Sequence, residues 1–297
     1  MTGNKLSLSG SPATPRRSLT LKGIWFTDGH RIALWDDTSR RHIAKARADL
    51  QNLLLPVLNP ACTHVKWRGG LKRAIRDIHT NLPHYPFVAR FDVKSYYDTM
   101  DHAILLSQLD KITDVPQDLR ETVRQYLEEP DTIQSGTGLS AGGSLSPLLA
   151  ALYLQPLDDA MQDLAADGSI FYRRFMDDFV ILARTRWRLR SAIRKVHQVL
   201  ASLGMCVHET KRFIGRSSAG FDFLGYHLDP ARRLRPSTES VRRLKERARR
   251  HSKNLCRFFS SLCFHEPLGF TSMEPQSKGS GSTLPDGVAG CGAGSIV

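Results

Sequence analysis

Apolar residues recur at helical spacing in several segments of the chain. In residues 37–55 they fall three or four positions apart, which predicts an amphipathic helix with Thr38 or Ser39 as its N-cap. Ser146 followed by Pro147 predicts another helix start, with Ser146 as N-cap and Pro147 at the first helical position. The predicted helices are residues 37–55, 70–81, a stretch from His102, a stretch from Ser146, 184–203 and 241–262.

Short apolar runs between polar turns predict β-strands. The run PFVARFDV (86–93) suits a buried strand. Residues 171–175 and 179–183 flank the tripeptide Met-Asp-Asp, which predicts two strands joined by a tight turn. A further strand is predicted for FDFLGYHL (221–228). The pattern therefore places an acidic dipeptide at the tip of a hairpin.

Charge narrows the classes of partner. The 297 residues contain 42 Lys and Arg against 29 Asp and Glu, a net charge of +13, and 41% hydrophobic residues argue against general disorder. The positive excess indicates a polyanion, either nucleic acid or an acidic membrane surface. No apolar run approaches the ~20 residues of a membrane span, and the N-terminus lacks a signal-peptide pattern. Five scattered cysteines without a CxxC pair fit a reducing compartment, so we expect a cytoplasmic protein that binds nucleic acid, not a membrane.

Three pairs of adjacent aspartates occur in the chain: Asp36-Asp37, Asp158-Asp159 and Asp177-Asp178. The first precedes a helix and the second lies in or near a helix end, so we expect both to be ordinary solvated residues. The third alone lies between two β-prone runs. Two acids at a hairpin tip repel each other unless a cation lies between them, although aspartate is also a common turn residue.

Asp92 strengthens the metal hypothesis, because it lies inside the predicted strand 86–93, where an unpaired carboxylate is costly. A strand acid beside an acidic hairpin tip suits phosphoryl transfer, in which two Mg²⁺ activate a 3′-hydroxyl and stabilise the leaving pyrophosphate. Nearby arginines would then balance polymer phosphates: Arg173, Arg174, Arg184, Arg186 and Arg188. Alternatively, Asp92 only caps a backbone group or pairs with one of these arginines.

Five ordered motifs resemble the palm motifs of reverse transcriptases. They are FDVKSYYD, GLSAGGSLSPLLAALYL, YRRFMDDFVIL, LGMCVHETK and FDFLGYHL. FMDD alone is a weak signal, but the ordered set is specific, and the similarity covers roughly residues 71–250. The chain resembles the bacterial, group II intron-like branch of the family. The resemblance implies an α+β right-hand polymerase fold with fingers, an antiparallel palm sheet and a short helical thumb.

With the composition of the chain ends, the resemblance implies five regions. They are a flexible N-terminal arm (1–20), fingers (21–90), a palm with the catalytic motifs (91–228), an abbreviated basic thumb (229–268) and a disordered tail (269–297).

The resemblance also implies the metal ligands. Asp92 matches the first metal-binding aspartate, and the carbonyl of Val93 is a further ligand. Asp177 matches the second catalytic aspartate and Asp178 its catalytic neighbour. The implied cofactor is Mg²⁺, or Mn²⁺ in its place.

Nucleotide contacts follow from the same comparison. Tyr97 matches an aromatic steric gate against the ribose 2′-hydroxyl, with a core aromatic as the alternative. Gly142 matches the loop that covers the incoming nucleotide, but Ser140-Ala141 stands where the family most often has Pro-Gln, so Ala141 lacks the side chain that contacts the sugar. Lys211 matches a lysine near the active site. Lys72 and Arg73 are candidates for triphosphate contacts.

Nucleic-acid contacts are expected in the last third of the chain. Residues 231–250 carry eight Arg and one Lys against two Glu, an excess of 9 − 2 = +7 that favours phosphate binding. The candidates are Arg242, Arg243, Arg249 and Arg250, with Phe223 and Gly225 in a segment similar to the primer grip. Cys and His residues between 251 and 265 fit no standard zinc spacing.

The function implied by the resemblance is RNA-directed DNA polymerisation with an RNA template, a DNA or RNA primer and dNTPs. A structured non-coding RNA or a partner protein is a further candidate partner, and a stand-alone retroelement or phage-defence enzyme is the implied setting. The alternatives are an RNA-directed RNA polymerase, untemplated terminal-transferase-like DNA synthesis, and a non-catalytic RNA-binding scaffold derived from a polymerase.

Overall fold

The computed structural model describes residues 18–27, 30–131, 134–231 and 234–263. Most of the predicted N-terminal arm and the whole tail predicted for 269–297 lie outside these residues. The end of the arm is a correction, because Leu19 is buried and its N–H donates to Oε1 of Gln125 at 2.9 Å. Among the described helices, none is both long and apolar enough to cross a membrane.

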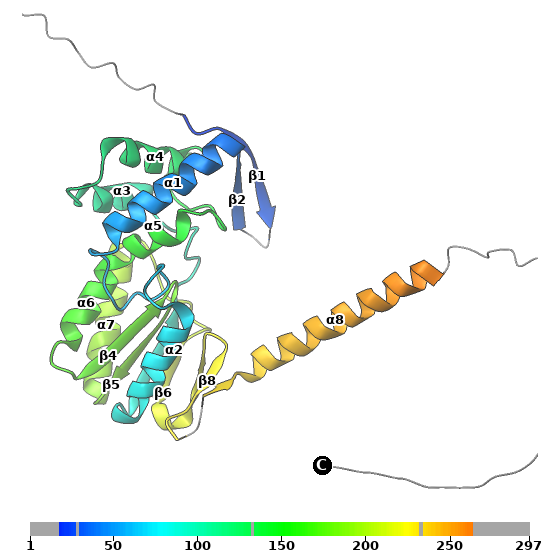
Figure 1. The fold of residues 1–297 in the computed structure, drawn as a ribbon. Coiled ribbons are helices and arrows are strands. Elements are labelled where there is room, and N and C mark those ends of the chain that lie inside the picture. The colour runs from blue at the N-terminus through cyan, green and yellow to red at the C-terminus, as the bar shows by residue number, and fades with distance from the viewer. Residues whose placement is uncertain (1–17, 28–29, 132–133, 232–233, 264–297) are drawn as a thin grey trace, which may run out of the picture. The chain divides into compact units, whose positions relative to one another are not determined.

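A four-stranded antiparallel sheet forms the centre of the fold (Figure 1). Its strands are β3 (Phe87–Asp92), β4 (Ile170–Phe175), β5 (Asp178–Ala183) and β6 (Phe213–Arg216), in the order β4-β5-β3-β6. The predicted strands in 86–93, 171–175 and 179–183 are therefore confirmed. The boundary between the expected fingers and palm, at residue 91, falls within β3.

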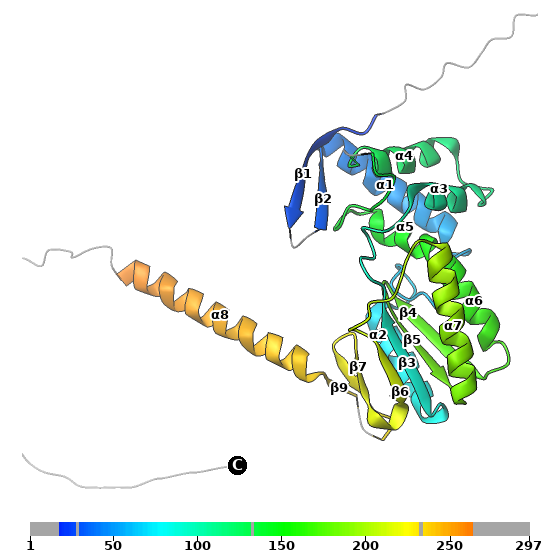
Figure 2. The ribbon, with the colours of Figure 1, turned by 180° about the vertical axis from the view of Figure 1, so that it is seen from behind.

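Helices cover both faces of this sheet because side chains alternate along its strands. Val88 of β3 packs with α2 (Gly70–Asn81), as do Val180 and Leu182 of β5. The opposite face packs against α6 (Gln155–Ala165) and α7 (Arg186–Ser202). Figures 1 and 2 show α2 on one side and α7 on the other.

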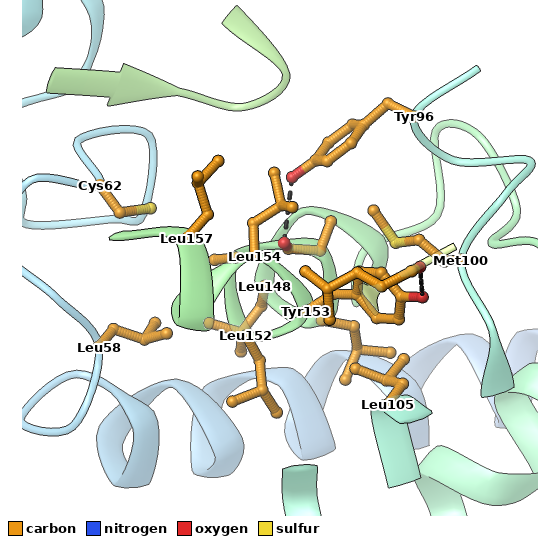
Figure 3. Packing of buried hydrophobic residues seen from close by; sticks show 14 of the residues in the cluster. Leu58, Cys62, Tyr96, Met100, Leu105, Leu148, Leu152, Tyr153, Leu154 and Leu157 are labelled. Atoms are coloured by element: carbon orange, nitrogen blue, oxygen red, sulfur yellow. Dashed lines mark hydrogen bonds between the residues drawn. The ribbon is translucent and has the colours of Figure 1, made fainter. Parts of the chain in front are cut away.

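A layer of helices adjoins this sheet. It consists of α1 (Asp37–Leu54), α3 (His102–Asp110), α4 (Gln117–Glu128) and α5 (Ser146–Tyr153). Figure 3 shows how α5 is surrounded by apolar side chains, with the Tyr96 hydroxyl donating to the carbonyl of Ala150 at 3.0 Å. An antiparallel hairpin of β1 (Leu21–Thr27) and β2 (His30–Trp35) completes this part and was not predicted from the pattern of apolar residues.

The segment 221–228 is a hairpin and not the single strand that was predicted. β7 (Phe221–Phe223) and β8 (Tyr226–Leu228) pair through a turn at Leu224 and Gly225. Both turn residues have positive φ (46° and 83°), as a two-residue type I′ turn requires.

The remaining elements are β9 (Arg235–Pro236), which pairs with β8, the 3₁₀ turns η1 (Leu82–His84) and η2 (Ser217–Ala219), and α8 (Thr238–Cys263). The chain divides into two compact units after Leu244, within α8.

Two predicted helix caps are wrong. Asp36 caps α1, since its carboxylate accepts from the N–H of Ser39 at 2.7 Å. The side chain of Ser146 makes no cap hydrogen bond. Its hydroxyl donates to the carbonyl of Ser140 at 2.6 Å and lies 2.8 Å from the Tyr126 hydroxyl, so it fixes the loop before α5.

Asp158 is buried, which corrects the expectation that it is solvated. Arg174 is buried beside it, so this arginine cannot contact polymer phosphates, which corrects that expectation as well. Nε of Arg174 donates to Oδ1 of Asp158 at 2.7 Å, Nη2 donates to Oδ2, and the Tyr172 hydroxyl donates to Oδ1 at 2.8 Å. This ion pair joins α6 to β4 inside the core.

Loss of one partner should be strongly destabilising, because it leaves an unpaired charge in the core. Arg174→Met should lower the free energy of unfolding by about 3–5 kcal/mol. The double variant Arg174→Met/Asp158→Leu should recover much of that loss, since no charge then stays buried. Urea unfolding measures both.

A surface pair provides the control. Arg188 and Asp167 lie 2.8 Å apart with both side chains more than 40% exposed, so Arg188→Met should change stability by less than about 1 kcal/mol. Equal losses in Arg174→Met and Arg188→Met would contradict the structural importance of the buried pair.

Candidate active site

Three carboxylates meet at one end of the central sheet. Asp92 ends β3 and pairs in register with Asp178, the first residue of β5. Asp177 lies in the two-residue turn that joins β4 to β5. The N–H of Val93 donates to the carbonyl of Asp177 at 3.1 Å, which ties the turn to the end of β3. The structure therefore brings together the three acids that the sequence singled out.

The turn before Asp177 is held from both sides. Met176 has a φ of 57°, the left-handed value that a two-residue hairpin turn requires at its first position. Its N–H donates to Nδ1 of His64 at 3.0 Å, and its carbonyl accepts from Nη1 of Arg174 at 3.0 Å. Nε2 of His64 lies 3.0 Å from the carbonyl of Pro147.

His64 is neutral in this position. Burial, and then the charge of Arg174, lower the pKa of His64 to about 4. With Nδ1 as acceptor, the ring carries its proton on Nε2 and donates it to Pro147. Sequence reasoning missed His64, because it lies in a loop without periodicity.

The acids lack sufficient positive charge. Burial raises the pKa of Asp177, and the charge of Asp92 raises it further. Burial, followed by the charges of Asp177 and Asp92, raises the pKa of Asp178 to about 7. Nζ of Lys211 lies 3.7 Å from Oδ2 of Asp92, so the structure also brings this lysine to the site. Lys211, Arg90 and Arg174 lower these pKa values but do not offset burial and the repulsion between the acids, so the site favours cations.

These residues fit a Mg²⁺ site of the open kind. Mg²⁺ binds through one or two carboxylates together with water and substrate phosphates, and seldom in an all-protein cage. In the described part of the chain, no group of three or more His, Cys, Asp or Glu side chains is arranged so that it could hold a metal ion by itself. The residues that would hold the ions are Asp92, Asp177 and Asp178, with the carbonyl of Val93.

Tyr97 lies beside these acids. It is half-buried, with its ring 5.1 Å from that of Tyr96. Burial, and then the negative charge of Asp177, raise the pKa of Tyr97 to about 12. The carbonyl of Tyr97 accepts from the N–H of Leu139 at 2.8 Å, so Tyr97 and the loop before α5 are joined.

This loop holds the glycine pair expected over the nucleotide. Gly142 is exposed with a φ of 72° and open space around it. A Cβ on Gly143 would lie 1.8 Å from the Tyr126 hydroxyl, so only glycine fits there. Oγ of Ser140 accepts from the N–H of Ala33 in β2 at 2.7 Å, a bond that proline at position 140 could not make. The loop is therefore anchored to the N-terminal hairpin, and Ala141 is half-buried within it.

Comparison with protein families decides the assignment. The family model for reverse transcriptase (RNA-dependent DNA polymerase) matches residues 36–228, which is 193 of the 297 residues and contains every carboxylate of the site. The chain belongs to the reverse transcriptase family. No curated protein matches the sequence.

Solved structures of telomerase from Candida tropicalis share the fold of this reverse transcriptase domain. The apo form truncated from its C-terminal domain has a TM-score of 0.57 at 13% identity, covering 76% of this chain and 56% of that one. The complex with a TWJ fragment of telomeric RNA has a TM-score of 0.54 at 12% identity, covering 74% and 44%. The chain thus spans about half the length of these structures. The α+β fold with antiparallel sheets is confirmed.

Two expected triphosphate contacts lie on α2 of the reverse transcriptase domain. Lys72 and Arg73 are exposed. Arg73 donates to the carbonyl of Arg68 at 3.3 Å and lies 3.5 Å from Asp77. Their role toward the nucleotide stays a prediction.

The segment similar to a primer grip has one buried and one exposed candidate. Phe223 is 1% exposed and packs in the core, so its side chain cannot touch nucleic acid, which corrects that expectation. Gly225 is exposed at the turn, and its carbonyl accepts from the N–H of Ser237 at 2.8 Å. In this hairpin the backbone of the turn, and not the side chain of Phe223, is therefore accessible to nucleic acid.

The arginines expected in the thumb lie on α8. Arg242 and Arg243 both bind Glu239, at 2.7 and 2.8 Å, and these bonds lower the pKa of Glu239 to about 2. Glu239 therefore offsets part of their charge. Arg249 and Arg250 are exposed in the second unit of the chain, and phosphate binding by all four stays a prediction.

A basic cavity of about 680 Å³ adjoins Lys211, between β6 and the β7–β9 sheet. Arg90 lines this cavity. Its Nη1 donates to the carbonyl of Asp222 at 2.8 Å, and its Nη2 donates to the carbonyl of Lys211 at 2.5 Å. Sequence reasoning missed this basic wall, whose other cations are Arg212 and Arg235. The residues come from three separate segments, so no local pattern marks them.

Without metal, ionisation of Asp178 should lower the stability of the protein as the pH rises. Asp178 has a pKa of about 7 when folded against ~3.9 when unfolded, so the folded state binds its proton more tightly. That contribution is complete below pH ~4 and is lost as the pH rises through ~7. In EDTA, we expect the contribution of Asp178 to the free energy of unfolding to fall by on the order of 1–3 kcal/mol between pH 5 and 8. His64 acts in the opposite direction, because its lowered pKa adds stability as the pH rises toward 6.5.

Asp178→Asn keeps the shape without the ionisation and should remove this contribution, while the contribution of His64 is the same in both proteins. Urea unfolding of both proteins across the pH range measures the difference. Parallel profiles would show that Asp178 ionises freely.

Proposed function

We propose that this chain is an RNA-directed DNA polymerase of the group II intron-like branch, which extends a primer with dNTPs. The observation that carries the proposal is the meeting of Asp92, Asp177 and Asp178 at one sheet end, with Tyr97 beside Asp177. The family match supports the reaction class. The likeness to a telomerase bound to telomeric RNA supports an RNA template.

The carboxylates would act by holding two divalent ions. When bound, such ions supply activation of the primer 3′-hydroxyl and neutralise charge on the triphosphate. The chain contributes rigidity, because Met176 is held on both sides by His64 and Arg174, so Asp177 needs no rearrangement before reaction. Lys211, beside Asp92, is the group placed to give a proton to the leaving pyrophosphate.

Sugar selection would come from shape. The ring of Tyr97 is packed against Tyr96, and its backbone carbonyl is held by the N–H of Leu139, so the residue cannot easily yield to an extra 2′-oxygen. Most RNA-directed RNA polymerases have an acid at this place, and the aromatic residue favours dNTPs.

Loss of one acid should abolish synthesis without unfolding the protein. Asp177→Asn and Asp92→Asn should each lower Mg²⁺-dependent dNTP incorporation on an RNA template by at least about a hundredfold. Single-nucleotide extension of a labelled primer measures the rate. Asp159→Asn is the control, since Asp159 is the exposed member of another aspartate pair.

Full activity in a folded Asp177→Asn variant would overturn the assignment of the site. Extension that needs no template would instead support terminal-transferase-like synthesis, which Ala141 in place of glutamine leaves open.

A smaller residue at position 97 should relax sugar selection. Tyr97→Ala should raise the ratio of rNTP to dNTP specificity constants about ten- to hundredfold, because relief of a steric clash is worth ~1–3 kcal/mol. Tyr96→Phe, next to it, should keep the wild-type ratio. Melting temperatures are measured alongside, and an unchanged ratio in a folded Tyr97→Ala variant would exclude the steric gate.

A further inference from the structure

A basic surface lies on α7 and the neighbouring edge strand β6. α7 contains no acidic residue, and Arg186, Arg190 and Arg194 follow one another at every fourth position. All three are exposed, as is Arg216 at the end of β6. Each step of four residues advances about 6 Å along a helix, so the three guanidinium groups form a row. We call these four arginines the α7 patch.

The α7 patch is uncompensated. Some other arginines are paired with carboxylates, as Arg173 is with Asp77 at 2.9 Å and its α7 neighbour Arg188 is with Asp167 at 2.8 Å. Within the described residues, no carboxylate lies within 4 Å of the four arginines of the α7 patch. Like charges four residues apart destabilise a helix. A row that nothing in the fold neutralises therefore indicates an anionic partner.

Apolar side chains form the floor between these charges. A hollow of about 280 Å³ lies between α7 and β6, over Phe87, Leu189 and Ile214. Arg186 and Arg216 both stack on the ring of Phe87, at 5.7 and 5.8 Å, which orders their guanidinium groups.

The hollow has an aromatic neighbour. A second hollow of about 430 Å³ shares Arg190 and Ile193 with the first and is lined by Trp187 and Arg194. Trp187 is 64% exposed, an unusual setting for so large an apolar ring. Exposed aromatic rings beside a row of cations are typical of surfaces on which unpaired bases stack.

This surface lies away from the carboxylates. Phe87 pairs with Ala183 and Arg216 at one end of β3, whereas Asp92 pairs with Asp178 at the other. Five residues of strand separate the two ends by roughly 16 Å. A strand on the α7 patch is therefore not the segment being copied at the carboxylates.

We propose that the α7 patch binds a single-stranded segment of RNA outside the copied region, with phosphates on the arginine row and an unpaired base against Trp187. Stacking, together with charge, favours RNA over an acidic protein. The use of RNA and not DNA rests on the proposed function, while the site itself does not.

The test uses a labelled RNA stem-loop with an eight-nucleotide loop. The protein is first saturated with a primer–template whose primer ends in a dideoxynucleotide, and stem-loop binding is followed by fluorescence anisotropy at several salt concentrations. The variant is Arg186→Gln/Arg190→Gln/Arg194→Gln. The matched control, Arg41→Gln/Lys45→Gln/Arg124→Gln, removes three exposed charges from α1 and α4.

We expect the wild type and the control to bind the stem-loop equally. The α7 variant should bind at least tenfold more weakly, and its plot of log K against log salt should be shallower by about two, at ~0.7 per lost phosphate contact. Trp187→Ala should weaken binding about tenfold with an unchanged slope, since stacking releases no counterion. Melting temperatures identify variants that do not fold, and in that case single Arg190→Gln and Arg194→Gln variants replace the triple one.

Three outcomes would overturn the proposal. They are equal binding by the α7 variant and the control, tighter binding of a DNA stem-loop of the same sequence, and displacement of the RNA by polyglutamate at equal charge concentration. A failure of the proposed function shows differently, as absence of primer extension. The stem-loop comparison can then be made on the free protein.

Discussion

The ion pair between Arg174 and Asp158 is the interaction on which the site depends. Two buried charges are tolerated only when their hydrogen-bonding groups have partners. Here the Tyr172 hydroxyl donates to Asp158, and the backbone carbonyls of Ala151 and Met176 accept from Arg174. Through one guanidinium group, α6, α5, β4 and the turn at Met176 and Asp177 are fixed relative to one another. The conformation of Asp177 is thus set by Arg174, a residue that is fully buried and therefore cannot contact a substrate.

The central part of the site could be predicted from the sequence because its signals are local. Two β-prone runs around Met-Asp-Asp fix a hairpin, and an acid inside an apolar run fixes Asp92 at the end of the adjacent strand. The buried pair was missed although a signal existed. Alternation in β4 puts Arg174 on the same face as Ile170 and Tyr172, so period two alone assigns it to the core.

Other features had weaker signals or none. Asp28-Gly29 between two apolar runs is a strong sign of a hairpin and could have revealed β1 and β2. Leu224-Gly225 is a poor sign of a hairpin, since leucine rarely adopts positive φ. The turn in 221–228 is held by hydrogen bonds from Ser237 and Ser240 to the carbonyl of Gly225. His64 and Met176 are 112 positions apart in the sequence, and the local pattern of apolar residues cannot predict a contact between residues so far apart.

The two edges of the central sheet are closed by different means. At β4, Arg174 exchanges backbone hydrogen bonds with Ala61 and Thr63, so a loop covers that edge. Within the described residues, no further strand pairs with the other edge, β6, which has only four residues, follows Lys211 and Arg212 and ends in Arg216. Short, charged edges resist pairing with a second sheet. The cations along β6 thereby protect the protein from edge-to-edge aggregation, and sequence changes that remove them would reduce its solubility before they altered its fold.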